Sequence, residues 1–340
     1  MNIKKETLNL ENLKPTHIDL ETKFKFISIS GEDSENFLQN QLTNDINQLD
    51  ESSHLLSGYC NAKGRTIALI RVFKIDKNNF YLVMPDCVVE KVVKKFNFYK
   101  LRSKLKISEQ ESDLVVFGVW SKNISLEKGK LVKSDDILVA KDESCPLYGE
   151  RAWIIAKKSV MLQEIREIEN LRKERIVSNP HESPLWMESE FLLGNIWILI
   201  DNSESFIPQT LNLDLNNSVS FKKGCYPGQE IVARTHFLGK VKRRTILLEM
   251  IINKDEVFDF YKKKPIYMKL LSDNNVIEIG SIFLIFKTFL KNENIYRILL
   301  FVDAKINEIP DEISKFVLYL GEDQQNTLNF LKLPYFKNFV

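Results

Sequence analysis

The octapeptide Lys223-Gly224-Cys225-Tyr226-Pro227-Gly228-Gln229-Glu230 places a cysteine among several chemically active neighbours. Pro227 and Gly228 are typical of a type II turn, because Pro fixes φ at one central position and Gly allows positive φ at the next. Residues 229–234 then predict a helix with an acid in its first turn. A thiol just before a helix N-terminus and beside two lysines is expected to have a lowered pKa. Cys225 would then be a nucleophile or a metal ligand.

Cys225 also has a plainer interpretation. A single cysteine is more often a small buried apolar side chain than a reactive thiol, and Gly224 and Gly228 would then serve the turn alone. The other cysteines lie at positions 60, 87 and 145, without Cys-x-x-Cys or similarly close metal spacing. The spacing therefore predicts neither a disulfide framework nor a metal site within the chain.

The composition is that of a folded protein with little net charge. Its 340 residues predict two or three domains, and the 44% of apolar residues are enough for real cores. The net charge of +2 argues against the global basic field of many nucleic-acid-binding proteins. A local basic cluster nevertheless surrounds the octapeptide, and it suits phosphate, a polyglutamate tail or water. Its members are Lys222, Lys223, Lys240, Lys242, Arg243 and Arg244.

The sequence shows no sign of a membrane or export segment. Its longest apolar stretch is too short and too interrupted for a membrane span, and residues 1–20 are charged rather than signal-like. We therefore expect a cytoplasmic protein that makes no membrane contact.

The first 240 residues predict two β-rich units, each closed by a helix. In the first unit, alternating apolar residues predict strands at 24–30, 67–75 and 79–84, with helices at 33–42 and 88–98. In the second unit, strands are expected at 114–120, 137–140 and 152–156, followed by a helix at 160–175. Two such units predict paired α+β subdomains.

The pattern changes after residue 240 to short strands at regular spacing. They are expected at 245–251, 265–271, 277–286, 295–302, 316–320 and 327–332. This spacing predicts a C-terminal antiparallel β-barrel.

The octapeptide resembles the K-G-C-Y-x-G-Q-E motif of the YgfZ family, folate-binding relatives of the glycine-cleavage T-protein. Further matching segments flank it and extend over nearly the whole chain. They are residues 31–34, 37–39, 41–45, 54–56, 60–65, 206–209, 212–213, 220–223, 232–234, 239–240, 243–244 and 333–335. The length of this match makes the resemblance highly specific.

The resemblance implies a T-protein-like fold of three lobes around a central folate cleft. Residues 1–240 would form a folate-binding module of two interleaved α+β subdomains, and residues 241–340 would form the barrel. The implied cofactor is tetrahydrofolate or a one-carbon derivative, contacted by Trp186 and Phe24. Folate needs aromatic contacts and a carboxylate or amide for its pterin. Without the resemblance, both residues would be assigned to the core.

The resemblance also implies that Cys225 is the functional thiol, as a redox group, a transient cluster ligand or the acceptor of an adduct. Tyr226 and Gln229 would shape its pocket, and Glu230 with Arg234 could form an i,i+4 pair. The matched positions around Cys225 are Lys223, Gly224, Tyr226, Gly228, Gln229, Glu230 and Arg234. The other three cysteines are expected to be structural.

Two positions depart from the family pattern. Leu192 stands where relatives carry the acid that would hold the pterin, and Asn61 stands where they often carry Asp. Glu188 and Glu190 are close to Leu192 in sequence but would project from other faces of a helix, so neither is a ready substitute.

The implied function is support of iron–sulfur enzymes, including those that methylthiolate tRNA, by an accessory factor rather than a turnover enzyme. Direct contact with tRNA is left open. One alternative is a T-protein-like aminomethyltransferase, but those enzymes carry an Asp-Asp pair where this chain has Ala68-Leu69. A second alternative is a folate-free adaptor, which Leu192 favours.

Overall fold

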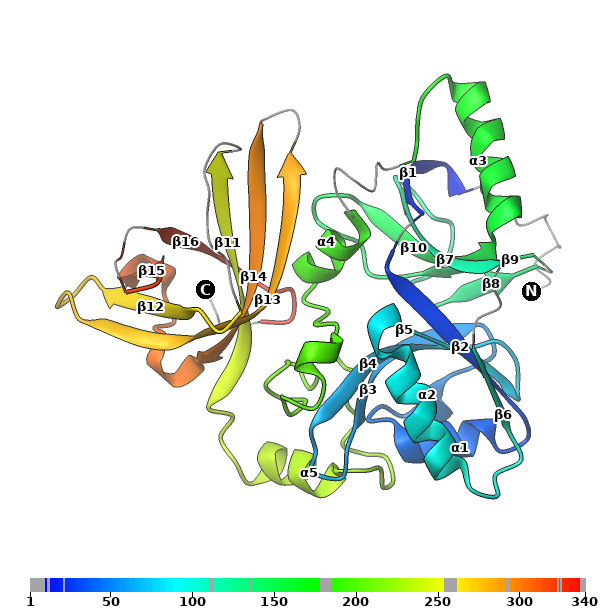
Figure 1. Cartoon of the computed structure of the whole chain (residues 1–340), viewed down its shortest axis with the longest axis horizontal. Helices are drawn as coiled ribbons and strands as arrows, with labels where there is room; N and C mark the ends of the chain where they lie inside the picture. The colour runs from blue at the N-terminus through cyan, green and yellow to red at the C-terminus, as the bar shows by residue number, and fades with distance from the viewer. Residues whose placement is uncertain are drawn as a thin grey trace.

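The computed structural model describes residues 10, 13–20, 22–109, 113–134, 136–177, 185–253, 262–290, 294–322, 324 and 326–336. Within these residues the chain forms two five-stranded sheets and one closed barrel (Figure 1). Residues 1–20 are predicted not to form a signal peptide, and the first nine of them lie outside the described residues.

The first sheet has the order β3-β4-β5-β2-β6 and is covered on one face by two helices. Its strands are β2 (Phe24–Ser30), β3 (Ser53–Cys60), β4 (Thr66–Lys74), β5 (Asn79–Pro85) and β6 (Lys106–Glu109). The helices are α1 (Ser34–Gln41) and α2 (Asp86–Lys100). Val88, Val92 and Phe96 recur at helical spacing on α2 and are buried against the sheet. Every residue of β4 is buried, because one face of the strand packs in the helix-covered core and the other in the central cluster of Leu69, Phe73 and Trp153.

The second sheet has the order β1-β7-β10-β9-β8 and packs against α3 (Lys158–Arg172). Its strands are β1 (Pro15–Asp19), β7 (Leu114–Ser121), β8 (Leu131–Lys133), β9 (Ile137–Lys141) and β10 (Glu150–Lys157). Met161, Ile165 and Ile168 form the buried stripe of α3. Because β1 precedes the strands of the first sheet yet pairs with β7, the two sheets are interleaved in sequence, as predicted.

The C-terminal strands close into an antiparallel barrel, which confirms the predicted architecture. Its order is β11 (Arg243–Asn253), β14 (Ile295–Lys305), β13 (Val276–Leu290), β12 (Pro265–Leu270), β15 (Phe316–Leu320) and β16 (Thr327–Leu331). β16 pairs back onto β11 and closes the ring. Alternate apolar residues such as Ile246, Leu248 and Ile298 fill the interior.

Helix α4 (Leu185–Leu192) lies between the barrel and the second sheet (Figure 1). Its Glu188 accepts hydrogen bonds from Tyr148 Oη at 3.0 Å and from Thr288 Oγ1 at 3.2 Å. Glu188 also forms a 3.0 Å ion pair with Arg297 of β14. One buried carboxylate therefore ties α4 to both lobes.

The remaining helix is α5 (Gln229–Phe237), and short 3₁₀ turns complete the described secondary structure. These turns are η2 (Ile46–Gln48), η3 (Ile200–Asn202), η4 (Ile306–Glu308) and η5 (Ile313–Lys315). In the described part of the chain, no helix combines the length and apolar character that crossing a bilayer requires.

Candidate functional site

A pocket of about 400 Å³ opens where the two sheets meet the segment after α4 and the C-terminal segment. Its wall combines apolar, amide and charged side chains. The lining residues are His54, Leu55, Leu56, Arg71, Lys128, Gly129, Asp142, Glu143, Leu193, Asn195, Leu215, Asn216, Asn217, Pro334 and Tyr335. Among the described residues, none of the octapeptide belongs to this lining.

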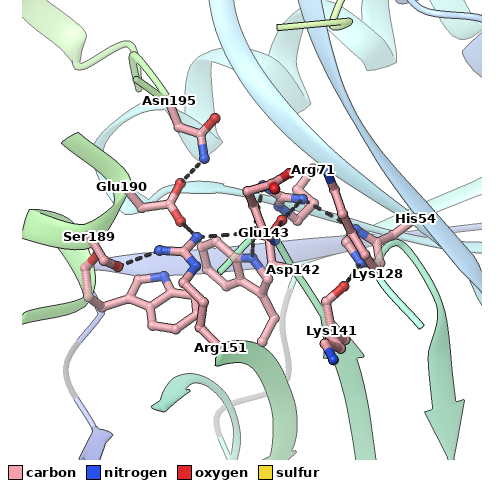
Figure 2. Close-up of polar contacts among 12 residues, drawn as sticks. His54, Arg71, Lys128, Lys141, Asp142, Glu143, Arg151, Ser189, Glu190 and Asn195 are labelled. Atoms are coloured by element: carbon pink, nitrogen blue, oxygen red, sulfur yellow. Dashed lines mark hydrogen bonds and ion pairs between the residues drawn. The ribbon is translucent and has the colours of Figure 1, made fainter. Parts of the chain in front are cut away.

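A buried network of charges lies beside the pocket. The Asp142 carboxylate lies between two guanidinium groups, 2.9 Å from Arg71 Nη2 and 3.0 Å from Arg151 Nη2. Arg151 also pairs with Glu190 of α4 and donates to Ser189 Oγ (Figure 2). Burial alone would raise the pKa of Asp142, but the two guanidinium cations hold it well below its usual range. Both carboxylates thus have arginine as their counter-charge.

His54 extends the network into the pocket wall. Its Nε2 lies 2.8 Å from the carbonyl oxygen of Lys141, and its Nδ1 faces Arg71 Nη1 at 3.3 Å. Because Arg71 only donates, Nδ1 accepts and the imidazole is neutral with its proton on Nε2. Burial, together with the nearby Arg71 cation, lowers the pKa of His54 from 6.5 to about 4.

Two buried donors in the lining have no partner among the described residues. They are Arg71 Nε and Asn216 Nδ2. A buried N–H group without an acceptor is unfavourable, so these two donors mark positions in the lining residues where the described chain supplies no partner.

The predicted folate contacts Trp186 and Phe24 lie in a central aromatic cluster, not on the pocket lining. Trp186 is 0% exposed, with ring centroids 4.7 Å from Trp153 and 5.2 Å from Trp120. Arg151 lies over the Trp186 ring at 4.4 Å. Phe24 packs edge-on against Trp197 at 4.7 Å. A ligand would reach either ring only after this cluster opened, so their contact with folate stays a prediction.

The octapeptide forms the predicted turn before α5 and packs on the loop after β3. Gly228, at φ +80°, precedes α5, and a Cβ added there would lie 2.4 Å from the carbonyl oxygen of Asn61 and 2.5 Å from Gly64 Cα. Gly64 is also at positive φ, +68°. The two glycines therefore allow a backbone contact that any side chain would block.

The lysine that begins the octapeptide has a structural contact. Lys223 is buried, and its Nζ donates to the carbonyl oxygens of Gln39, Leu42 and Asn44 at 2.5, 2.6 and 2.8 Å. These acceptors lie in the last turn of α1 and just after it, where an ammonium group is favourable. Burial lowers the pKa of Lys223 from 10.5 to about 8. Its ammonium is therefore engaged with α1 as well as placed near Cys225 in sequence.

The cysteines separate into two buried and two exposed residues. Cys225 is exposed, in keeping with a thiol that meets partners, whereas Cys60 and Cys145 are buried. Cys87, in the first turn of α2, is exposed as well, so its structural role stays a prediction. Within the described residues, no three His, Cys, Asp or Glu side chains gather as a metal site would require.

The remaining octapeptide positions differ in their surroundings. Tyr226 is buried, Gln229 begins α5, and Gly224 has no neighbour that a Cβ would touch. Glu230 and Arg234 are both exposed, and the described residues include no ion pair between them.

One residue connects the octapeptide to the pocket. Asn44 accepts from Lys223 through its carbonyl oxygen, and its Nδ2 donates to the carbonyl oxygens of Leu56 and Asn217, each at 2.8 Å. Leu56 and Asn217 both line the pocket. Asn44 thus contacts two residues of the pocket lining and the first residue of the octapeptide at once.

Comparisons with known proteins address the expected family. No family model matches the chain. The tRNA-modifying protein YgfZ of Colwellia psychrerythraea is 29% identical over 252 residues, which cover 72% of this chain and 75% of that protein. The resemblance to the YgfZ family is confirmed.

The fold of this YgfZ-like chain has a solved counterpart. The glycine cleavage system aminomethyltransferase T of Bartonella henselae superposes with a TM-score of 0.68 at 12% identity, over 96% of this chain and 88% of that one. At this identity the likeness concerns the fold, and it confirms the T-protein-like arrangement.

The structure shows the contacts of Leu192 and Asn61, the two positions that depart from the YgfZ pattern. Leu192 is half-buried against the central cluster and does not line the pocket. Asn61 uses its Nδ2 to donate to Glu204 at 2.7 Å, and its Oδ1 accepts from the backbone N–H groups of Lys63 and Arg65. Asn61 therefore shapes the loop beneath Gly228.

Proposed function

We propose that this chain binds tetrahydrofolate, or a one-carbon derivative, in the pocket between its sheets. With Cys225 it would support the synthesis or repair of iron–sulfur enzymes in the cytoplasm, and through them the methylthiolation of tRNA. The observation that carries the folate part is the pocket itself, which combines apolar walls, unpartnered buried donors and a cation in a T-protein-like fold.

The size and chemistry of the pocket fit a reduced folate. Its volume of about 400 Å³ falls within the range of about 300 to 1,000 Å³ usual for small-molecule sites. Leu56, Leu193, Leu215 and Pro334 offer apolar surface for the ring systems. Lys128, largely exposed and paired with Glu143, would offer a cation to the glutamate tail.

A bound reduced folate would supply a carrier for one-carbon units. The protein's own groups would then orient it: Arg71, held by Asp142, and Asn216 each present a buried donor. The exposed Cys225 lies outside the lining, so we infer that it serves a partner protein and not the pterin directly.

Two alternative functions can be weighed against the structure. An aminomethyltransferase of the T-protein type would need a carboxylate where Ala68 and Leu69 are fully buried apolar residues of β4, which disfavours it. A folate-free adaptor is favoured by one observation, that Trp186 and Phe24 are enclosed in the core.

An anaerobic calorimetric titration with tetrahydrofolate tests the proposal. We expect one-to-one binding by the unmodified chain and the same affinity for Cys225→Ala, because the thiol lies outside the pocket lining. Absence of binding by the unmodified chain would leave the folate-free adaptor as the function.

A further inference from the structure

Asn195 presents an unused hydrogen-bond acceptor at the pocket. Its Nδ2 donates to Glu190 Oε2 at 2.8 Å, and Asn195 itself lines the pocket. No hydrogen bond from the described residues reaches its Oδ1. Figure 2 shows this amide oxygen pointing away from Glu190.

The orientation of the Asn195 amide follows from the hydrogen bonds of Glu190. Glu190 is fully buried, and its carboxyl oxygens accept from the Arg151 guanidinium and from two further N–H groups. Trp197 Nε1 also donates to Glu190 Oε2, at 2.6 Å. The Asn195 amide must therefore turn its nitrogen to Glu190, which leaves the oxygen for the pocket.

The two carboxylates of the lining are already engaged. Glu143 pairs with Lys128. Asp142 already accepts from Arg71, Arg151, Trp153 Nε1 and the backbone N–H of Glu143, which fills its lone-pair directions. Leu192 is apolar and does not line the pocket. Asn195 Oδ1 thus remains as an acceptor held by a buried side-chain network.

We propose that Asn195 Oδ1 recognises the N–H edge of the pterin ring and so determines the specificity of the pocket. The inference rests on the proposed function, since it names the group that would recognise the bound folate. Asn195 belongs to the same pocket lining as Arg71 and Asn216, which carry the two unpartnered donors Nε and Nδ2. A pterin carries both ring N–H groups and a carbonyl oxygen, so it can satisfy acceptor and donors together.

Two substitutions at this position test the inference by titration with tetrahydrofolate. Asn195→Ala removes the acceptor and should weaken binding about tenfold. Asn195→Asp should bind within about threefold of the unmodified chain. The new carboxyl has the shape of the amide and would still present an oxygen to the ligand. Thermal unfolding of each variant checks that the fold is kept.

The outcomes separate this inference from the proposed function. If the unmodified chain binds and folded Asn195→Ala binds equally well, Asn195 is not the recognising group although the folate site stands. If Asn195→Ala does not fold, loss of binding by a folded Asn195→Asp overturns the inference in the same way. If the unmodified chain does not bind, both proposals fail.

Discussion

Arg71 and Asp142 form a buried ion pair that joins the two sheets, with Arg71 Nη2 2.9 Å from Asp142 Oδ2. Arg71 comes from β4 of the first sheet, and Asp142 directly follows β9 of the second. The same Asp142 oxygen also neutralises Arg151. Asp142 therefore contacts both buried cations at the wall of the pocket, and Glu190 supplies the second negative charge to Arg151.

Asp142→Asn should lower the free energy of unfolding by about 3 to 5 kcal/mol, because buried Arg71 would lose its counter-charge and Arg151 would keep only Glu190. Urea denaturation measures the change. Asp136→Asn is the matched control, since Asp136 pairs with Lys157 at the surface and should change stability by less than about 0.5 kcal/mol. A loss below about 1 kcal/mol for Asp142→Asn would contradict the assigned role.

Gly228→Ala should destabilise the protein by at least about 2 kcal/mol, because the new Cβ would meet backbone atoms at a positive φ. Those atoms are the Asn61 carbonyl oxygen and Gly64 Cα. Gly224→Ala is the control within the same octapeptide, since a Cβ there meets nothing within 4 Å. Equal urea midpoints for the two variants would show that the octapeptide does not pack on the loop as described.

The stability of the protein should fall as the pH drops from 6.5 to about 4, partly through His54. The folded-state pKa of His54 is lowered from 6.5 to about 4, so in this window the unfolded chain binds a proton that the folded chain does not. The His54 contribution is fully present above pH 6.5, and about 3 kcal/mol of it is lost by pH 4. His54→Gln should flatten this part of the profile in urea denaturation. A variant with the same slope as the unmodified chain would mean that His54 is not buried neutral.

The fold could be predicted closely from the sequence because its signals are local. The alternation of apolar residues and the turn residues predict the barrel strands, including β15 at 316–320. The stripe of apolar residues at helical spacing predicts α2. The turn chemistry of Pro227 and Gly228 placed the start of α5. β1 and β3 were not predicted, since their pattern in sequence is weaker than the pairing that tertiary contacts supply.

The pocket could not be predicted in the same way, because its residues come from separate elements. Arg71, Asp142, Arg151 and Glu190 are brought together by packing of the two sheets with α4. A signal was present in Arg71, a charged residue inside the apolar stretch of β4. Trp186 and Phe24 were chosen by resemblance, and the structure places both in the core.

Alkylation of the native protein should modify Cys225 and Cys87, and leave Cys60 and Cys145 unmodified. The last two are buried, and burial raises the pKa of Cys60 to about 12. Peptide mass spectrometry after brief treatment with iodoacetamide identifies the sites. Modification of Cys60 ahead of Cys225 would be inconsistent with the structure.

Cys225→Ser should fail to restore tRNA methylthiolation in cells that lack the native protein, whereas Cys87→Ser should restore it. Both thiols are exposed, so the comparison separates the octapeptide from simple exposure. Mass spectrometry of tRNA nucleosides gives the readout. Full restoration of methylthiolation by Cys225→Ser would show that the Cys225 thiol is not needed and that the residue serves only the turn.

The central claim is that folate occupies the pocket between the sheets, and a titration with a pocket-filling variant tests it most directly. Leu215 lines the pocket, so Leu215→Trp should fill it and abolish tetrahydrofolate binding. Leu171, 72% exposed on α3 and not part of the lining, provides the control Leu171→Trp, which should bind as the unmodified chain does. Equal affinity of a folded Leu215→Trp and Leu171→Trp for tetrahydrofolate would contradict the account.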